Sequence, residues 1–171
     1  MPINTLSLQA IFLAWRGISA SYANYYNLIY KSRKQEALEK LALLKQTYIN
    51  HGAKALEDAI GNSIKYKADP IDHAKSPWVT IIDGFGDCED MMLLVNECIP
   101  GCKLYDLVRM KNGKMVDYKT KWHFVLLDPD GVVWSNGKQV NIDVDGYAKR
   151  LKSTHIVQLD AKLYIKSVVN T

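Results

Sequence analysis

The sequence contains few cysteines, and their odd number argues against a framework of disulfide bonds. Only three cysteines occur in 171 residues, and Cys98 and Cys102 lack the paired Cys and His spacing of a zinc site. Clusters of basic residues are also missing, because the 22 lysines and arginines are scattered among 18 acids and give a net charge of +4. We therefore expect no nucleic-acid partner.

The sequence also lacks a hydrophobic run long enough for a membrane span. The apolar stretch at residues 8–15 ends at Arg16 and Gly17, and no positively charged segment precedes it. We expect a buried helix there, with neither a signal peptide nor a membrane partner. The scarcity of cysteines and the lack of a leader favour a reducing, cytoplasmic location.

Hydrophobic residues make up 48% of the chain, which is enough for one well-buried core. Their helical spacing predicts helices over residues 6–30, from 32 to a stop at His51-Gly52, and over about 56–60. Tyrosines crowd the second half of the first helix, which makes it a candidate face for a protein partner. The approach to the glycine turn at residue 84 is expected to be irregular.

After Pro100 the pattern changes to a period of two, which predicts antiparallel strands. We expect a strand over 103–110, a hairpin turn at Asn112-Gly113 and a return strand from Val116. Later strands are expected before and after a turn at 128–131, and a single last strand over 157–165. Helices followed by antiparallel strands predict an α+β domain with its helices on one face of the sheet.

The segment that begins at Gly84 predicts a helix with a cysteine in its first turn. The Gly84-Phe85-Gly86 run permits a tight turn, Asp87 is suited as the N-cap, and good helix formers follow. Free backbone N–H groups and the helix dipole would favour the thiolate of Cys88, which is the nucleophilic form of a cysteine. Cys88 is therefore a candidate nucleophile.

Three acids lie next to Cys88, and they oppose its ionisation. The negative charges of Asp87, Glu89 and Asp90 raise the pKa of a neighbouring thiol. These acids therefore need another role. We expect them to form a capping box at the helix start, to neutralise a nearby cation, or both.

A histidine on the strand before the 128–131 turn is the candidate base. If a two-residue turn closes this hairpin, His123 faces Asn136, which can then orient the imidazole. Asn136-Gly137 also suits a turn of its own. We prefer the set Cys88, His123 and Asn136, because Asp128 lies five residues along the strand on its other face; Asp128 and Ser135 remain alternatives.

Several segments, in this order, resemble the bacterial transglutaminase-like cysteine peptidases. They are Ile64–Asp69, Pro77–Thr80, Asp83–Asp90 and His123–Leu126, and the Gly-Asp-Cys-Glu-Asp run is the most specific of them. The resemblance covers about residues 55–142. It implies a papain-like catalytic core of the transglutaminase type, which we place at residues 55–171, with residues 1–54 as a helical extension packed on it.

The resemblance also implies roles for individual residues. Cys88 resembles the nucleophile and His123 the general base, whereas Asn136 stands where the family usually has aspartate. An asparagine can fix the imidazole tautomer but cannot stabilise an imidazolium by charge. Acids beside the cysteine bind calcium in some relatives, so Asp87 and Glu89 are candidate calcium ligands, although no cofactor is required.

Two functions are open at this point. One is a cysteine peptidase or amidase that forms a thioester with a protein or peptide substrate, with Trp78, Asp87 and Trp122 lining or supporting the cleft. The other is an inactive module that binds a protein through its N-terminal helices, which the acids around Cys88 and the missing aspartate favour. Family members commonly carry a signal peptide, so its lack here favours a specialised or phage-encoded relative in the host cytoplasm or a virion.

Overall fold

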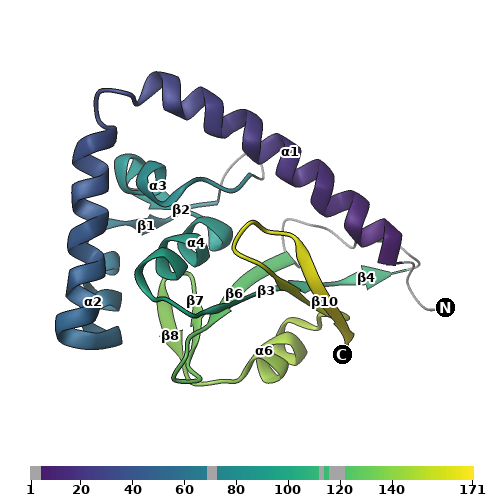
Figure 1. The fold of residues 1–171 in the computed structure, drawn as a ribbon. Coiled ribbons are helices and arrows are strands. Elements are labelled where there is room, and N and C mark those ends of the chain that lie inside the picture. Colours follow the sequence, from purple (N-terminus) through teal and green to yellow (C-terminus); the bar gives the residue numbers. More distant parts are fainter. Residues whose placement is uncertain (1–4, 69–72, 112–113, 116–121) are drawn as a thin grey trace.

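The computed structural model describes residues 5–68, 73–111, 114–115 and 122–171. The helices are α1 (Thr5–Ile29), α2 (Lys34–Ser63), α3 (Pro77–Asp83), α4 (Cys88–Cys98) and α6 (Val144–Leu151). Antiparallel strands form the main sheet, so the predicted α+β class is confirmed (Figure 1). Within the described residues, no helix is both long and apolar enough to cross a membrane.

The main sheet has six strands among the described residues. In spatial order they are β10 (Ile165–Asn170), β9 (His155–Leu159), β3 (Lys103–Val108), β6 (Trp122–Leu127), β7 (Val133–Ser135) and β8 (Lys138–Val140). Two smaller pairs accompany it. Strand β1 (Lys65–Tyr66) runs parallel to β2 (Phe85–Gly86), and β4 (Met110–Lys111) pairs with β5 (Lys114–Met115).

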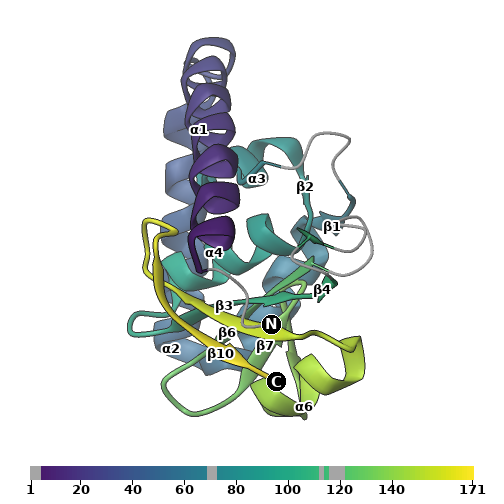
Figure 2. The same cartoon turned by 90° about the vertical axis from the view of Figure 1, so that its right-hand side faces the viewer.

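Strand β6 has two buried faces. Phe124 and Leu126 pack in the main core with α4, whereas Val125 packs in a second cluster with Ala148 of α6. Figure 2 shows α1 and α4 on one side of the sheet and α6 on the other. The prediction that all helices lie on one face is therefore wrong, because it did not include α6.

The break predicted at Gly52 is confirmed, because α2 consists of two helical segments that meet there. Gly52 has non-helical backbone angles (φ 79°, ψ −172°), so the chain kinks there and the helix resumes at once. The boundary placed after residue 54 falls inside α2, just past this kink. The stretch expected to be irregular contains α3, which has Pro77 in its first turn and ends at Gly84 in the left-handed conformation (φ 70°).

The C-terminal segment forms a hairpin in place of the single predicted strand. Strands β9 and β10 pair with each other, and the chain turns between them. The Asp160 carboxylate accepts the backbone N–H groups of Lys162 and Tyr164 at 2.8 and 2.9 Å. Leu163 adopts a positive φ of 63° in this turn. The alternation of apolar residues continues through this turn, so the sequence pattern predicted one strand where the chain reverses direction.

The earlier predicted hairpin is supported at its flanks. Met110 pairs with Met115 and Lys111 with Lys114, as a turn at Asn112-Gly113 requires. The turn itself lies outside the described residues, as does the return segment from Val116 to residue 121.

The tyrosine row of α1 packs against the rest of the chain. Tyr26 Oη lies 3.1 Å from Nε2 of His73, and Tyr30 donates to Asp83 at 2.7 Å. Tyr22 stacks on His73, with ring centroids 4.1 Å apart. These side chains thus fix α1 to the segment before the cysteine helix, and a partner at the N-terminal helices stays a prediction.

Candidate active site

Cys88 is the first residue of α4, as predicted. Asp87 is the N-cap in an extended conformation, and its N–H donates to Asp90 Oδ2 at 3.3 Å within a capping box. Gly86 makes this turn sterically feasible, since a Cβ there would lie 2.7 Å from the Cβ of Asp90. Local sequence alone therefore explains why the thiol lies at a helix start.

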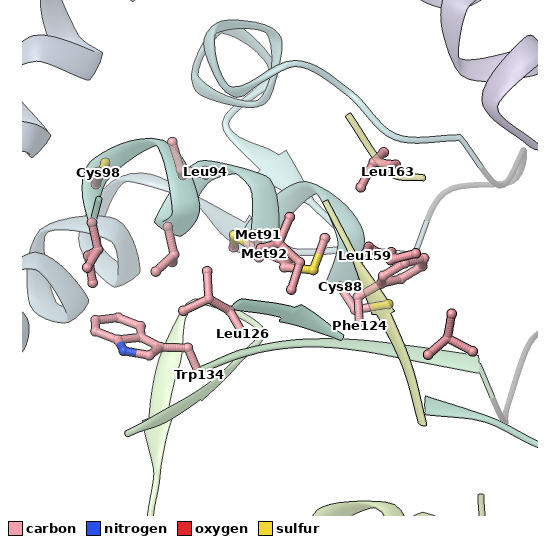
Figure 3. Close-up of a cluster of buried hydrophobic side chains, with 14 of the residues drawn as sticks. Cys88, Met91, Met92, Leu94, Cys98, Phe124, Leu126, Trp134, Leu159 and Leu163 are labelled. Atoms are coloured by element: carbon pink, nitrogen blue, oxygen red, sulfur yellow. The ribbon is translucent and has the colours of Figure 1, made fainter. Parts of the chain in front are cut away.

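The surroundings of Cys88 favour the neutral thiol. Its side chain is 8% exposed and lies in the core beside Phe124 and Leu159 (Figure 3). Burial raises the pKa of Cys88 well above its usual value, and the charge of Glu89 raises it further. A backbone hydrogen bond from Phe124 acts in the opposite direction. Burial and the Glu89 charge thus oppose the effect of the helix start on the thiol.

The acids beside Cys88 divide into separate roles. Glu89 is buried and accepts the Cys88 thiol, with 3.3 Å between Sγ and Oε2. Asp90 faces the buried Lys75 ammonium, whose Nζ lies 3.2 Å from its Oδ2 and 3.4 Å from Oδ2 of Asp83. Burial and the charge of Asp87 raise the pKa of Asp90 to about 7, and Lys75 opposes this. Both expected roles, capping and neutralising a cation, are thus confirmed.

His123 lies on β6 next to Phe124, but the two side chains leave the strand on opposite faces. Phe124 packs with Cys88 in the main core, whereas His123 packs against α6. Its Nε2 is 2.8 Å from Oγ of Ser135, and its ring stacks on Tyr147 of α6, with centroids 5.6 Å apart. Burial lowers the pKa of His123 to about 4, so the imidazole is neutral near pH 7. Among the contacts of the described residues, no hydrogen bond joins Cys88 to His123.

The predicted partner of His123 is wrong by one residue. In the hairpin, Val125 faces Ser135 and Leu127 faces Val133. The loop has three residues, because Asp128 N–H donates to the Val132 carbonyl at 3.0 Å and Gly131 takes a left-handed φ of 83°. The expected two-residue turn would have placed Asn136 opposite the histidine.

Asn136 and Asp128 both serve turns. Asn136 has a φ of 53° and is followed by Gly137 at 76°, in the tight turn between β7 and β8. Asp128 is buried and accepts the N–H groups of Asp130 and Val132 and the indole of Trp134, at 2.9–3.0 Å. The structure brings neither to His123, and Ser135 holds the orienting position.

The two tryptophans named from sequence support neighbouring elements. Trp78 packs on Ala37 of α2 and on Val79, and the Lys34 ammonium lies over its ring. Trp122 donates to the buried Asp106 and packs on Phe12, with ring centroids 5.6 Å apart. These contacts give both tryptophans a supporting role, and a place in a substrate cleft stays a prediction.

Tyr66 and Tyr147, which the sequence did not identify as site residues, lie near Cys88 and His123 respectively. Tyr66 pairs with Gly86 through β1 and β2. Burial raises the pKa of Tyr66 to about 12, with added contributions from the charges of Cys88, Asp87, Glu89 and Tyr147. Because Tyr147 stacks on His123, both sides lie within electrostatic range of Tyr66. The local signals for the helix that carries Tyr147 were its N-cap, Asp143, and the helical spacing of Val144, Tyr147, Ala148 and Leu151.

Neither a metal site nor a family is identified for the described part of the chain. Within the described part of the chain, no group of three or more His, Cys, Asp or Glu side chains is arranged to hold a metal ion. Calcium at Asp87 and Glu89 stays a prediction. No protein-family model matches the chain, and no curated protein matches it in sequence. The resemblance to transglutaminase-like peptidases therefore rests on its own segments.

Proposed function

We propose that the protein is a cysteine-dependent hydrolase or acyltransferase that acts on amide bonds of peptides or proteins, with a papain-like core of the transglutaminase type. One observation carries this proposal. Cys88 begins α4 and lies in the main core with Phe124, the residue after His123 on β6. Ser135 occupies Nε2 of His123, so Nδ1 is the ring nitrogen that is left for the thiol proton.

The proposed reaction transfers one proton in each direction. As Cys88 Sγ forms a bond to the substrate carbonyl carbon, the thiol proton passes to Nδ1 of His123. Backbone N–H groups at the start of α4 stabilise the oxyanion. Collapse breaks the C–N bond, the amine leaves with the proton from His123, and a thioester remains. Water or a second amine then releases the acyl group.

The neutral resting pair has a consequence for this mechanism. The pKa of Cys88 is raised and that of His123 is lowered, both mainly by burial. A thiolate–imidazolium pair is therefore not preformed. Proton transfer accompanies the attack, which makes His123 a general base and not a fixed counter-ion.

A second candidate is an inactive module that binds a protein. The bond from the Cys88 thiol to the buried Glu89 favours it, because this contact holds the proton on sulfur. Calcium bound at Asp87 and Glu89 would draw Glu89 away from Cys88 and would favour catalysis. The cytoplasmic location stays a prediction of the composition.

Trapping of an acyl-enzyme separates the two candidates. The protein is incubated with a pool of peptides that contain glutamine and small-residue amide bonds, with calcium or with a chelator, and is quenched in acid. We expect wild type to show peptide-sized adducts on Cys88 by mass spectrometry, because a thioester persists at low pH. Cys88→Ala should show none.

Cys98→Ala is the matched control, since Cys98 is a buried cysteine at the other end of α4 whose pKa burial raises to about 12. This variant should keep the adduct. Equal labelling of wild type and Cys88→Ala, or no adduct under either calcium condition, would support the binding module.

A further inference from the structure

The hydroxyl group beside His123 is linked to a tyrosine on α6. Ser135 Oγ lies 2.8 Å from Nε2 of His123 and 2.9 Å from Oη of Tyr147. The Tyr147 ring also lies nearly parallel to the imidazole, with 15° between the two planes. Tyr147 therefore contacts both the proposed base and the residue that orients it.

The direction of these hydrogen bonds decides whether His123 can act as a base. A neutral imidazole carries one proton, and only the tautomer with that proton on Nε2 leaves Nδ1 able to accept from a thiol. In this tautomer Ser135 Oγ must accept from Nε2–H. The same holds for the imidazolium, in which both ring nitrogens donate.

The Ser135 hydroxyl must then donate its own proton to an acceptor other than His123. Its side chain is buried, with 6% exposure, so a lost acceptor would be costly. Oη of Tyr147 is the second polar atom within hydrogen-bond distance of Oγ. Tyr147 is half-buried, which allows its own O–H to donate to solvent.

We propose that Tyr147 is a positioning residue that holds His123 in its reactive tautomer by accepting the proton of Ser135, an inference that rests on the proposed function. The unreactive tautomer does not need Tyr147, because Ser135 can then donate to Nε2. Loss of Oη therefore destabilises the reactive tautomer and the imidazolium selectively. A pair of hydroxyl groups thus substitutes for the charged acceptor that an aspartate would provide.

The test begins with Tyr147→Phe, which keeps the stacked ring and removes only Oη. The probe is 4-nitrophenyl acetate, which acetylates Cys88 and releases 4-nitrophenolate. We expect acetylation to slow about tenfold, equivalent to ~1.4 kcal/mol. Nitrogen-15 NMR of His123 should show the proton mainly on Nε2 in wild type and mainly on Nδ1 in Tyr147→Phe.

The same Tyr147→Phe substitution, made in a protein that already carries a change at Ser135, distinguishes a positioning role from structural support. In Ser135→Asp the carboxylate accepts from Nε2–H and has no proton to pass on, so adding Tyr147→Phe should change the rate by less than about twofold. If Ser135→Asp does not fold, Ser135→Ala replaces it, because there the Tyr147 hydroxyl no longer connects to His123 through Ser135. Equal slowing by Tyr147→Phe in both backgrounds, or no slowing in either, would overturn the inference.

The two proposals fail in different ways. The NMR measurement reads the tautomer of His123 without any reaction at Cys88. If His123→Ala does not slow acetylation but Tyr147→Phe still moves the imidazole proton, the proposed function is wrong and the positioning effect stands. If His123→Ala slows acetylation but Tyr147→Phe changes neither rate nor tautomer, the positioning role is wrong.

Discussion

Replacement of His123 by alanine is expected to slow acetylation of Cys88 by 4-nitrophenyl acetate about 100-fold or more, the usual contribution of a general base. The reason is that Cys88 rests as a thiol, with its pKa raised by burial and by Glu89. Without an acceptor, attack depends on a very small thiolate fraction. The measurement is the initial rate of nitrophenolate release, with the site of acetylation verified by peptide mass.

His155→Ala is the matched control for this experiment. His155 is also a buried histidine whose pKa is lowered by burial, but it lies on β9 and bonds Thr154. Strand β3 separates β9 from β6. We expect its replacement to leave the acetylation rate within about twofold of wild type, as for independent distant sites. Similar slowing in both variants would show that loss of folding, and not loss of the base, explains the effect.

Replacement of Lys75 by methionine is expected to lower the free energy of unfolding by about 3–5 kcal/mol. Lys75 is 1% exposed, and its ammonium lies within 3.4 Å of Asp83 and Asp90 and 3.2 Å from the Phe85 carbonyl. The variant would leave two carboxylates without this cation in the core. Urea unfolding, followed by far-ultraviolet circular dichroism, measures the loss.

Lys54→Met tests whether burial of the charged groups is the cause of the lost unfolding free energy. Lys54 also pairs with two acids, Glu57 and Asp58, but its side chain is 71% exposed. Surface pairs of this kind contribute about 0–1 kcal/mol, so the change should be small. Equal shifts of the unfolding midpoint in both variants would contradict the role given to Lys75, whose ammonium links Asp83 of α3 to Asp90 of α4.

Local sequence was sufficient to predict the start of the cysteine helix. The glycines that permit the turn, the Asp87 cap and the Asp90 partner are all within seven residues of Gly84, so no tertiary information was needed. The acids beside Cys88 were expected to meet a cation, but the sequence did not identify Lys75.

The prediction of the residue that contacts His123 depended on the length of the loop between β6 and β7. Two-residue and three-residue turns both suit the segment after Leu127, and only the left-handed Gly131 in the folded chain decides for three. The longer loop shifts the register by one residue, so position 137 and not Asn136 comes opposite His123. Ser135, opposite Val125, reaches the imidazole as its diagonal neighbour on the same face. Tyr147 was missed because no helix was predicted there, although Val144, Tyr147, Ala148 and Leu151 recur at helical spacing. The raised pKa of Cys88 was missed because burial is a tertiary property.

The measurement that tests the central claim most directly is the pH dependence of Cys88 alkylation by iodoacetamide in wild type and in His123→Ala. The neutral imidazole is the base, and it predominates above the pKa of His123, which is about 4. We therefore expect wild type to react faster than the variant from about pH 5 to 8, and this advantage to disappear as the pH falls through about 4. Equal rates for wild type and His123→Ala at every pH would contradict a functional pair of Cys88 and His123.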